Sequence, residues 1–231
     1  MGKHKHNTDV EHHDPDKRLG AVSAKTGVKT LRVFDFDDTL VQTNSKVGVT
    51  EHSKLNGEQL REKYWLSAAE YAVFQKTKAA NPGVEYRFDY TQFIDVVEPK
   101  LVEGTFKILQ RVIKKMRSCG GIPAIILTAR GHHARDNIKE FLLDLDIDLP
   151  VVTLDNSNPT AKAAWLKQAM LARNIPHVEF FDDSPLNVKA VEELMHDPVL
   201  LDTFGSNLSI KSRLISVNVL ASSSCPSSSG C

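Results

Sequence analysis

Short apolar segments alternate with helical segments along most of this chain, and this alternation constrains the fold more than any other feature. The segments expected to be strands are 31–34, 122–127, 151–154, 177–181 and 213–220. Apolar residues at helical spacing occupy 104–118, 132–145 and 159–173, and a further helix is expected after Ser184. Strands that alternate with helices are typical of βαβ units, whose strands run parallel in one sheet. The sequence therefore predicts an α/β protein with a three-layer core and a mainly parallel sheet.

Two of the predicted helices carry clear start signals. Asn158 precedes Pro159, and Ser184 precedes Pro185. A side-chain oxygen just before a helix accepts a hydrogen bond from a free backbone N–H, and proline fits the first helical position because it lacks that group. We therefore expect both helices to begin at their proline.

The stretch that follows the first strand breaks the alternation. Ser67 and Glu70 fit a capping box ahead of a helical segment that runs to Phe74. Aromatic residues at alternating positions from 86 to 90 predict a strand with one exposed face. We expect residues 42–103 to form a small cap inserted after the first strand. Its aromatic residues would either stack on a nucleobase or form the small core of the cap itself.

The two ends of the chain differ in composition from the rest. Residues 1–28 contain no aromatic residue, and four of the nine histidines lie in the first 13 positions. Residues 222–231 are mostly serine. We expect a flexible N-terminal arm and a Ser-rich tail, with residues 29–221 forming the core and its cap. The histidines of the arm would either bind metal adventitiously or simply be solvated.

Composition excludes several classes of protein. The 29 Lys and Arg residues balance the 29 Asp and Glu residues, which removes the simplest case for a nucleic-acid-binding protein. No apolar run approaches the roughly 20 residues of a membrane span, and the first residues lack the apolar region of a secretory signal. The three cysteines form no CxxC pair, so neither a zinc site nor a thioredoxin-type motif is indicated. We expect a cytoplasmic protein with reduced thiols that does not associate with membranes.

Polar residues stand where the predicted strands end. Asp35 and Asp37 follow the first strand, and alternate residues of an extended chain face the same way. Open α/β sheets bind their ligands at the carboxyl ends of strands. The other polar residues at or near such positions are Thr128, Arg130, Lys162, Asp182 and Asp183. One acidic turn after a strand can be merely solvated, but four such signals in succession indicate one shared site.

These residue types suit phosphoryl chemistry. Crowded carboxylates repel one another unless a cation joins them, and oxygen ligands favour Mg²⁺. Mg²⁺ and a lysine would offset the negative charge of a phosphoryl group, and a hydroxyl would donate to one of its non-bridging oxygens. Asp35 would attack phosphorus and form an aspartyl-phosphate. Asp37 would protonate the leaving oxygen and later deprotonate the hydrolytic water.

The segments DFDDTL, ILTAR and FFDDSP, together with Lys162, resemble the four motifs of the haloacid dehalogenase (HAD) superfamily of phosphohydrolases, in the order found in that family. The resemblance covers roughly residues 31–220 and implies a Rossmann-like core with a small cap. It implies that Asp35 is the nucleophile, that Asp37 is the acid/base, and that Thr128 and Lys162 bind phosphate. It also implies that Mg²⁺ is held by the Asp35 carboxylate, the Asp37 backbone carbonyl and Asp182.

Other residues add candidates for substrate binding, and for two of the assigned positions an alternative is left open. Thr39 and Arg130 are additional candidates for substrate binding, and Arg130 lies two residues after the motif threonine. Asp38 stands where many family members have glycine. Lys167 is an alternative to Lys162, but it lies deeper in its helix. Whether Asp183 touches the metal directly or through water is left open.

The sequence thus predicts a Mg²⁺-dependent phosphomonoesterase that acts on a nucleotide or another small phosphorylated metabolite. A nucleic-acid 3′-end phosphatase is the alternative among enzymes, although the net charge does not support a nucleic-acid partner. No GxxxxGK[ST] loop accompanies it, so a kinase half is not expected. A catalytically silent module that binds a phosphorylated ligand is the alternative from another class.

Overall fold

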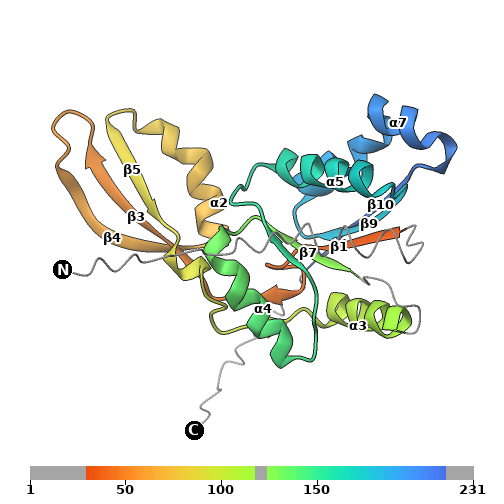
Figure 1. The fold of residues 1–231 in the computed structure, drawn as a ribbon. Helices are drawn as coiled ribbons and strands as arrows, with labels where there is room; N and C mark the ends of the chain where they lie inside the picture. Colours follow the sequence, from red (N-terminus) through yellow and green to blue (C-terminus); the bar gives the residue numbers. More distant parts are fainter. Residues whose placement is uncertain (1–29, 118–123, 217–231) are drawn as a thin grey trace, which may run out of the picture.

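The computed structural model describes residues 30–117 and 124–216, and its centre is a sheet of five parallel strands (Figure 1). In spatial order the strands are β10 (Ser209–Leu214), β9 (His177–Asp182), β1 (Thr30–Phe34), β7 (Ile125–Thr128) and β8 (Val151–Thr153). The first strand therefore lies in the middle, as in Rossmann-like sheets, and the chain winds outward from it in both directions. The predicted α/β class with a parallel sheet is confirmed.

Helices cover both faces of this sheet (Figure 1). One face carries α5 (Pro159–Arg173), α6 (Pro185–Glu192) and α7 (Pro198–Phe204), and the other carries α3 (Glu103–Arg117) and α4 (Arg135–Asp144). Successive strand residues point to opposite faces, so Val33 belongs to the core under α5 while Phe34 belongs to the core under α3 and α4. Both side chains are fully buried. The central strands are apolar where both of their faces are covered, as at Val33, Phe34 and Phe180, whereas Arg32 and Glu179 form an ion pair at a less buried position.

The helix starts follow the sequence signals. The Asn158 side chain accepts a hydrogen bond from the Thr160 N–H at 3.1 Å, and Ser184 accepts one from the Asn187 N–H at 3.4 Å. The segment predicted from His132 opens with a 3-10 turn, η3 (His132–Ala134), before α4 begins. Within the described ranges, no helix combines the length and the apolar character that crossing a membrane requires.

The last strand differs from its prediction. β10 begins at Ser209, four residues before the predicted start, and residues 217–220 of the predicted strand lie outside the described part of the chain. β10 is an edge strand that pairs with β9 alone. Because much of it is exposed, its sequence lacks the continuous apolar run that marks a central strand.

The segment after β1 forms a lobe of its own beside the core (Figure 1). It leaves and returns through β2 (Val41–Gln42) and β6 (Lys100–Leu101), which pair antiparallel. Between them lies an antiparallel three-stranded sheet in the order β4, β3, β5. The elements of this lobe are β3 (Lys46–Ser53), β4 (Gln59–Ser67), α2 (Ala68–Thr77), η1 (Lys78–Ala80), β5 (Val84–Asp89) and η2 (Thr91–Phe93).

Aromatic side chains pack this lobe internally. The predicted capping box of Ser67 and Glu70 is present, and α2 runs three residues beyond its predicted end. Tyr71 packs edge-to-face on Phe88 with ring centroids 5.4 Å apart, and Phe74 packs in the same way on Tyr86 at 5.0 Å. Of the two interpretations of these aromatic residues, the contacts favour a small core of the lobe itself.

Candidate active site

The candidate site lies where β1 and β9 end side by side. The two strands pair in register up to Phe34 and Phe181, and the Asp35 N–H donates to the Phe181 carbonyl at 2.9 Å. Asp35 and Asp182 therefore emerge next to each other. Since the chain winds away from β1 in both directions, these strand ends flank the switch point where open α/β sheets bind their ligands.

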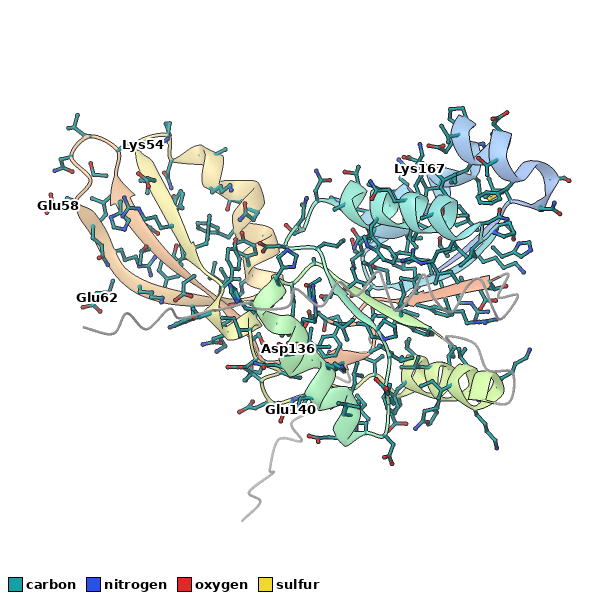
Figure 2. All side chains as sticks on the ribbon, viewed as in Figure 1. Lys54, Glu58, Glu62, Asp136, Glu140 and Lys167 are labelled. Carbon is teal, nitrogen blue, oxygen red and sulfur yellow. The ribbon has the colours of Figure 1, made fainter. Side chains whose placement is uncertain are left out.

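Lys162 joins these two acids. It lies in the first turns of α5, and its Nζ donates to Asp35 Oδ1 at 2.6 Å and to Asp182 Oδ2 at 2.7 Å. Its side chain is almost fully buried. Lys167 lies farther along α5 (Figure 2). It pairs with Asp197 at 2.7 Å instead. Of the two candidate lysines, the structure brings Lys162 to the acids.

A third acid completes the cluster. Carboxylate oxygens of Asp35, Asp182 and Asp183 lie within 4.8 Å of one another. Burial, helped by repulsion from neighbouring carboxylates, raises the pKa of Asp183 to about 6. Burial raises the pKa of Asp35 to about 8; Lys162 opposes this change, while Asp182 and Asp37 add to it. Burial lowers the pKa of Lys162, but the attraction of Asp35 and Asp182 outweighs it and the pKa is raised.

The donor set fits a hard divalent cation. Three carboxylates face one ammonium, which leaves two negative charges without a partner inside the cluster. Burial is the main cause of the raised pKa values of Asp35 and Asp183, and repulsion from neighbouring carboxylates adds to both. Three carboxylate oxygens in a small buried space are the ligands that Mg²⁺ prefers.

Asp37 faces a different partner. Arg130 donates from Nε to Asp37 Oδ2 at 2.8 Å and from Nη2 to Oδ1 at 2.7 Å. Its Nη1 donates to the backbone carbonyls of Phe93 and Asp95 at 2.9 and 2.7 Å, and Nη2 also donates to Thr43 Oγ1 at 3.2 Å. Every guanidinium N–H therefore has a protein partner. These contacts favour a role for Arg130 in holding Asp37, which differs from the predicted contact with substrate.

The two predicted threonines are both buried. Thr128 ends β7, the strand beside β1, and its Oγ1 accepts from the Arg130 N–H at 3.2 Å. Thr39 donates its hydroxyl to Asp183 Oδ1 at 3.5 Å. Thr39 therefore touches the acid cluster, and Thr128 stands at the end of the neighbouring strand.

The turn after β1 requires an unusual backbone conformation. Asp38 has φ of 55°, in the left-handed region. Aspartate tolerates this region better than most residues, and glycine does so without strain. This explains physically why Asp38 can occupy a position at which the resembled family often has glycine. Burial, followed by repulsion from Asp37, raises the pKa of Asp38.

Beside Asp37 a cavity of about 640 Å³ opens between the lobe and the core. The lobe contributes Val47, Tyr71, Tyr90, Thr91, Phe93 and Ile94 to its lining. The core contributes Asp37, Ala129, Arg130, Gly131, His133, Ala134, Asp155, Asn156 and Ser157. This volume falls within the range of small-molecule sites. A bound molecule would lie with one end at the acid/base candidate Asp37.

Asn187 belongs to the site but was missed in the sequence. Its Nδ2 donates to both carboxylate oxygens of Asp182, at 3.0 and 3.2 Å, and the Ser184 N–H donates to Oδ1 at 2.9 Å. The signal that could have revealed it is its place in the first turn of α6, a helix whose amino end faces the strand end. An amide there orients the metal-ligand candidate Asp182 as an outer partner does in metal sites.

The chain matches no protein-family model, no curated protein and no solved structure with which it was compared. Its class is therefore defined by the fold and the site alone. It is an α/β protein with a five-stranded parallel sheet, flanked by helices, and a buried acidic cluster at the switch point of that sheet. The cluster, the bridging lysine and the adjoining cavity carry the functional argument.

Proposed function

We propose that this chain is a Mg²⁺-dependent phosphomonoesterase of the haloacid dehalogenase type. The observation that carries the proposal is the bridge of Lys162 between Asp35 and Asp182, with Asp183 within reach of both acids. Three distant segments, in the predicted order, thereby contribute to one acidic site at the switch point of the sheet.

Asp35, Asp182 and Asp183 would hold Mg²⁺ through their carboxylates, and the Asp37 backbone carbonyl is the further ligand that the resemblance implies. When bound, Mg²⁺ supplies a positive charge that offsets the charge of the phosphoryl group. Lys162 adds an ammonium beside the same two acids, and Thr128 is the hydroxyl donor proposed for a phosphoryl oxygen.

The chain's own residues would carry out two displacements. In the first, a carboxylate oxygen of Asp35 forms a bond to phosphorus while the bond from phosphorus to the alcohol oxygen breaks. The carboxyl group of Asp37 gives its proton to the departing oxygen. In the second, water attacks the aspartyl-phosphate, Asp37 takes a proton from that water, and Asp35 is regenerated as inorganic phosphate leaves.

Asp37 lines the cavity, and its charge acts on the neighbouring Asp35, which suits this role. Its side chain is 29% exposed, whereas that of Asp182 is fully buried. A leaving alcohol in the cavity would thus lie beside the residue that must protonate it. The lobe that closes the other side of the cavity is proposed as the cap that shapes substrate choice. A small phosphorylated substrate and a cytoplasmic location complete the proposal.

Hydrolysis of p-nitrophenyl phosphate by the full chain tests the proposal. We expect turnover with Mg²⁺ and none after chelation, and loss of turnover in Asp35→Asn with an unchanged circular dichroism spectrum. Asp202→Asn, at an exposed position of α7, is the matched control and should retain turnover. Full activity of Asp35→Asn would exclude the mechanism. Failure of the wild type on every phosphomonoester would favour the silent binding module.

A further inference from the structure

We infer that the substrate of this site is a monophosphate of an uncharged alcohol, and that a second anionic group on that alcohol is rejected. The inference rests on the proposed function and deepens it by naming the substrate class. It follows from the charges that line the cavity between the lobe and the core.

The lining carries negative charge and little positive charge that is free to bind a ligand. Among its described residues, Asp37 and Asp155 are acidic, and Arg130 and His133 are basic. The guanidinium of Arg130 is buried, and all its N–H groups donate hydrogen bonds to Asp37, Thr43 and two backbone carbonyls of the lobe. This guanidinium therefore has no N–H left to donate paired hydrogen bonds to a second phosphate in the cavity.

Asp155 places an unpaired negative charge on the cavity wall. It follows β8, it is exposed, and its φ of 50° lies in the left-handed region. In the described part of the chain its carboxylate makes no ion pair and no hydrogen bond, and its Oδ1 lies by the backbone of Gly131. A like charge on a ligand in the cavity would be repelled by this carboxylate.

The rest of the lining suits hydroxyl groups and apolar carbon. The hydroxyls of Tyr71 and Tyr90 lie 2.6 Å apart at the lobe side. Thr91, Asn156 and Ser157 add neutral polar side chains, and Val47, Phe93 and Ile94 add apolar surface. Neutral donors and acceptors beside apolar side chains recognise sugars and nucleosides without requiring charge.

Two pairs of compounds that differ by one phosphate test this inference. They are adenosine 5′-monophosphate against adenosine 3′,5′-bisphosphate, and fructose 6-phosphate against fructose 1,6-bisphosphate. Each is assayed with the full chain and Mg²⁺ at pH 8, where imidazole groups are ordinarily neutral. Turnover is measured, and so is competition with p-nitrophenyl phosphate, which reports binding even of a compound that is not hydrolysed. We expect the monophosphate of each pair to be favoured about tenfold.

The variant Asp155→Asn links the preference to charge. Asparagine also adopts the left-handed conformation readily, so the backbone is kept while the charge is removed. We expect the ratio of monophosphate turnover to bisphosphate turnover to fall about threefold. Asp146→Asn is the matched control, because Asp146 also has a positive φ, of 59°, but precedes β8, whereas Asp155 follows it. It should leave the preference unchanged.

The outcomes separate the two proposals. Equal or better use of the bisphosphates overturns the inference while the phosphatase stands. A preference that Asp155→Asn leaves unchanged also overturns it, because charge on the cavity wall would then not be the cause. If p-nitrophenyl phosphate itself is not hydrolysed with Mg²⁺, the proposed phosphatase function is overturned, and so is the inference that rests on it.

Discussion

Arg130 holds the carboxylate of Asp37 through two parallel hydrogen bonds of 2.8 and 2.7 Å, although 93 residues separate the two in the chain. The same guanidinium donates to two backbone carbonyls in the segment that ends the lobe. One buried side chain thus links the proposed acid/base to the position of the lobe. The planar guanidinium can donate two parallel hydrogen bonds to one carboxylate, which a lysine ammonium does not do.

Replacing Arg130 by lysine should weaken protonation of the leaving group. Lysine keeps the charge but loses the paired bonds that orient Asp37. We expect turnover of glycerol 2-phosphate to fall about 100-fold, because an alkoxide needs a proton to leave. Turnover of p-nitrophenyl phosphate should fall much less, since its phenolate leaves unaided. Equal losses on both substrates would contradict a positioning role, and Arg111→Lys on α3 serves as the control.

Removing the ammonium of Lys162 should destabilise the fold. Lys162→Met keeps a similar volume but leaves Asp35 and Asp182 buried without their shared cation. Breaking a buried ion pair in this way costs about 3 kcal/mol of unfolding free energy. Urea denaturation in the presence of chelator measures the change. Lys167→Met, which removes a more exposed pair, should cost markedly less, and similar losses in both variants would argue against the buried bridge.

Mg²⁺ should stabilise the folded chain. A ligand that binds the native state alone adds about 1.4 kcal/mol for each tenfold rise in concentration above its Kd. Thermal unfolding of chelator-treated protein should therefore shift upward as Mg²⁺ is added. Asp183→Asn removes one carboxylate of the cluster and should weaken this response, whereas Asp202→Asn should keep it. An identical response in Asp183→Asn and the wild type would remove Asp183 from the proposed ligand set.

Stability at acid pH should depend in part on Asp197. Its hydrogen bond with Lys167 holds its pKa below the ordinary value of 3.8, and bonds from the first turn of α7 add to this. The folded state thus binds the proton less tightly than the unfolded state. The contribution is present above pH 3.8 and is lost as the pH falls through the folded value.

The variant Asp197→Asn tests this linkage, because asparagine still caps α7 but cannot pair with Lys167 as an anion. Urea midpoints of the wild type and the variant should differ at pH 7, and the difference should shrink as the pH falls below 3.8. A difference that stays constant over this range would show that the charge of Asp197 plays no part.

Local signals in the sequence were sufficient to predict the buried strands and the helix starts of the core. Continuous apolar runs such as 125–127 occur because strands covered on both faces bury every side chain. Asn158 with Pro159 and Ser184 with Pro185 mark helix starts because the first turn leaves backbone N–H groups free. The edge strand β10 was misplaced because half-exposed strands lack such a run.

The sequence alone determined the class of fold, because strand ends and helix starts are encoded in local periodicity and capping residues, and it indicated Asp35, Lys162 and Asp182 as members of one site. Tertiary structure alone decided which charges meet. Lys162 rather than Lys167 reaches the acids, Arg130 turns to Asp37, and Asn187 joins Asp182. The physical reason is that these partners are set by strand order and by the packing of α5 and the lobe, which bring together groups far apart in the chain.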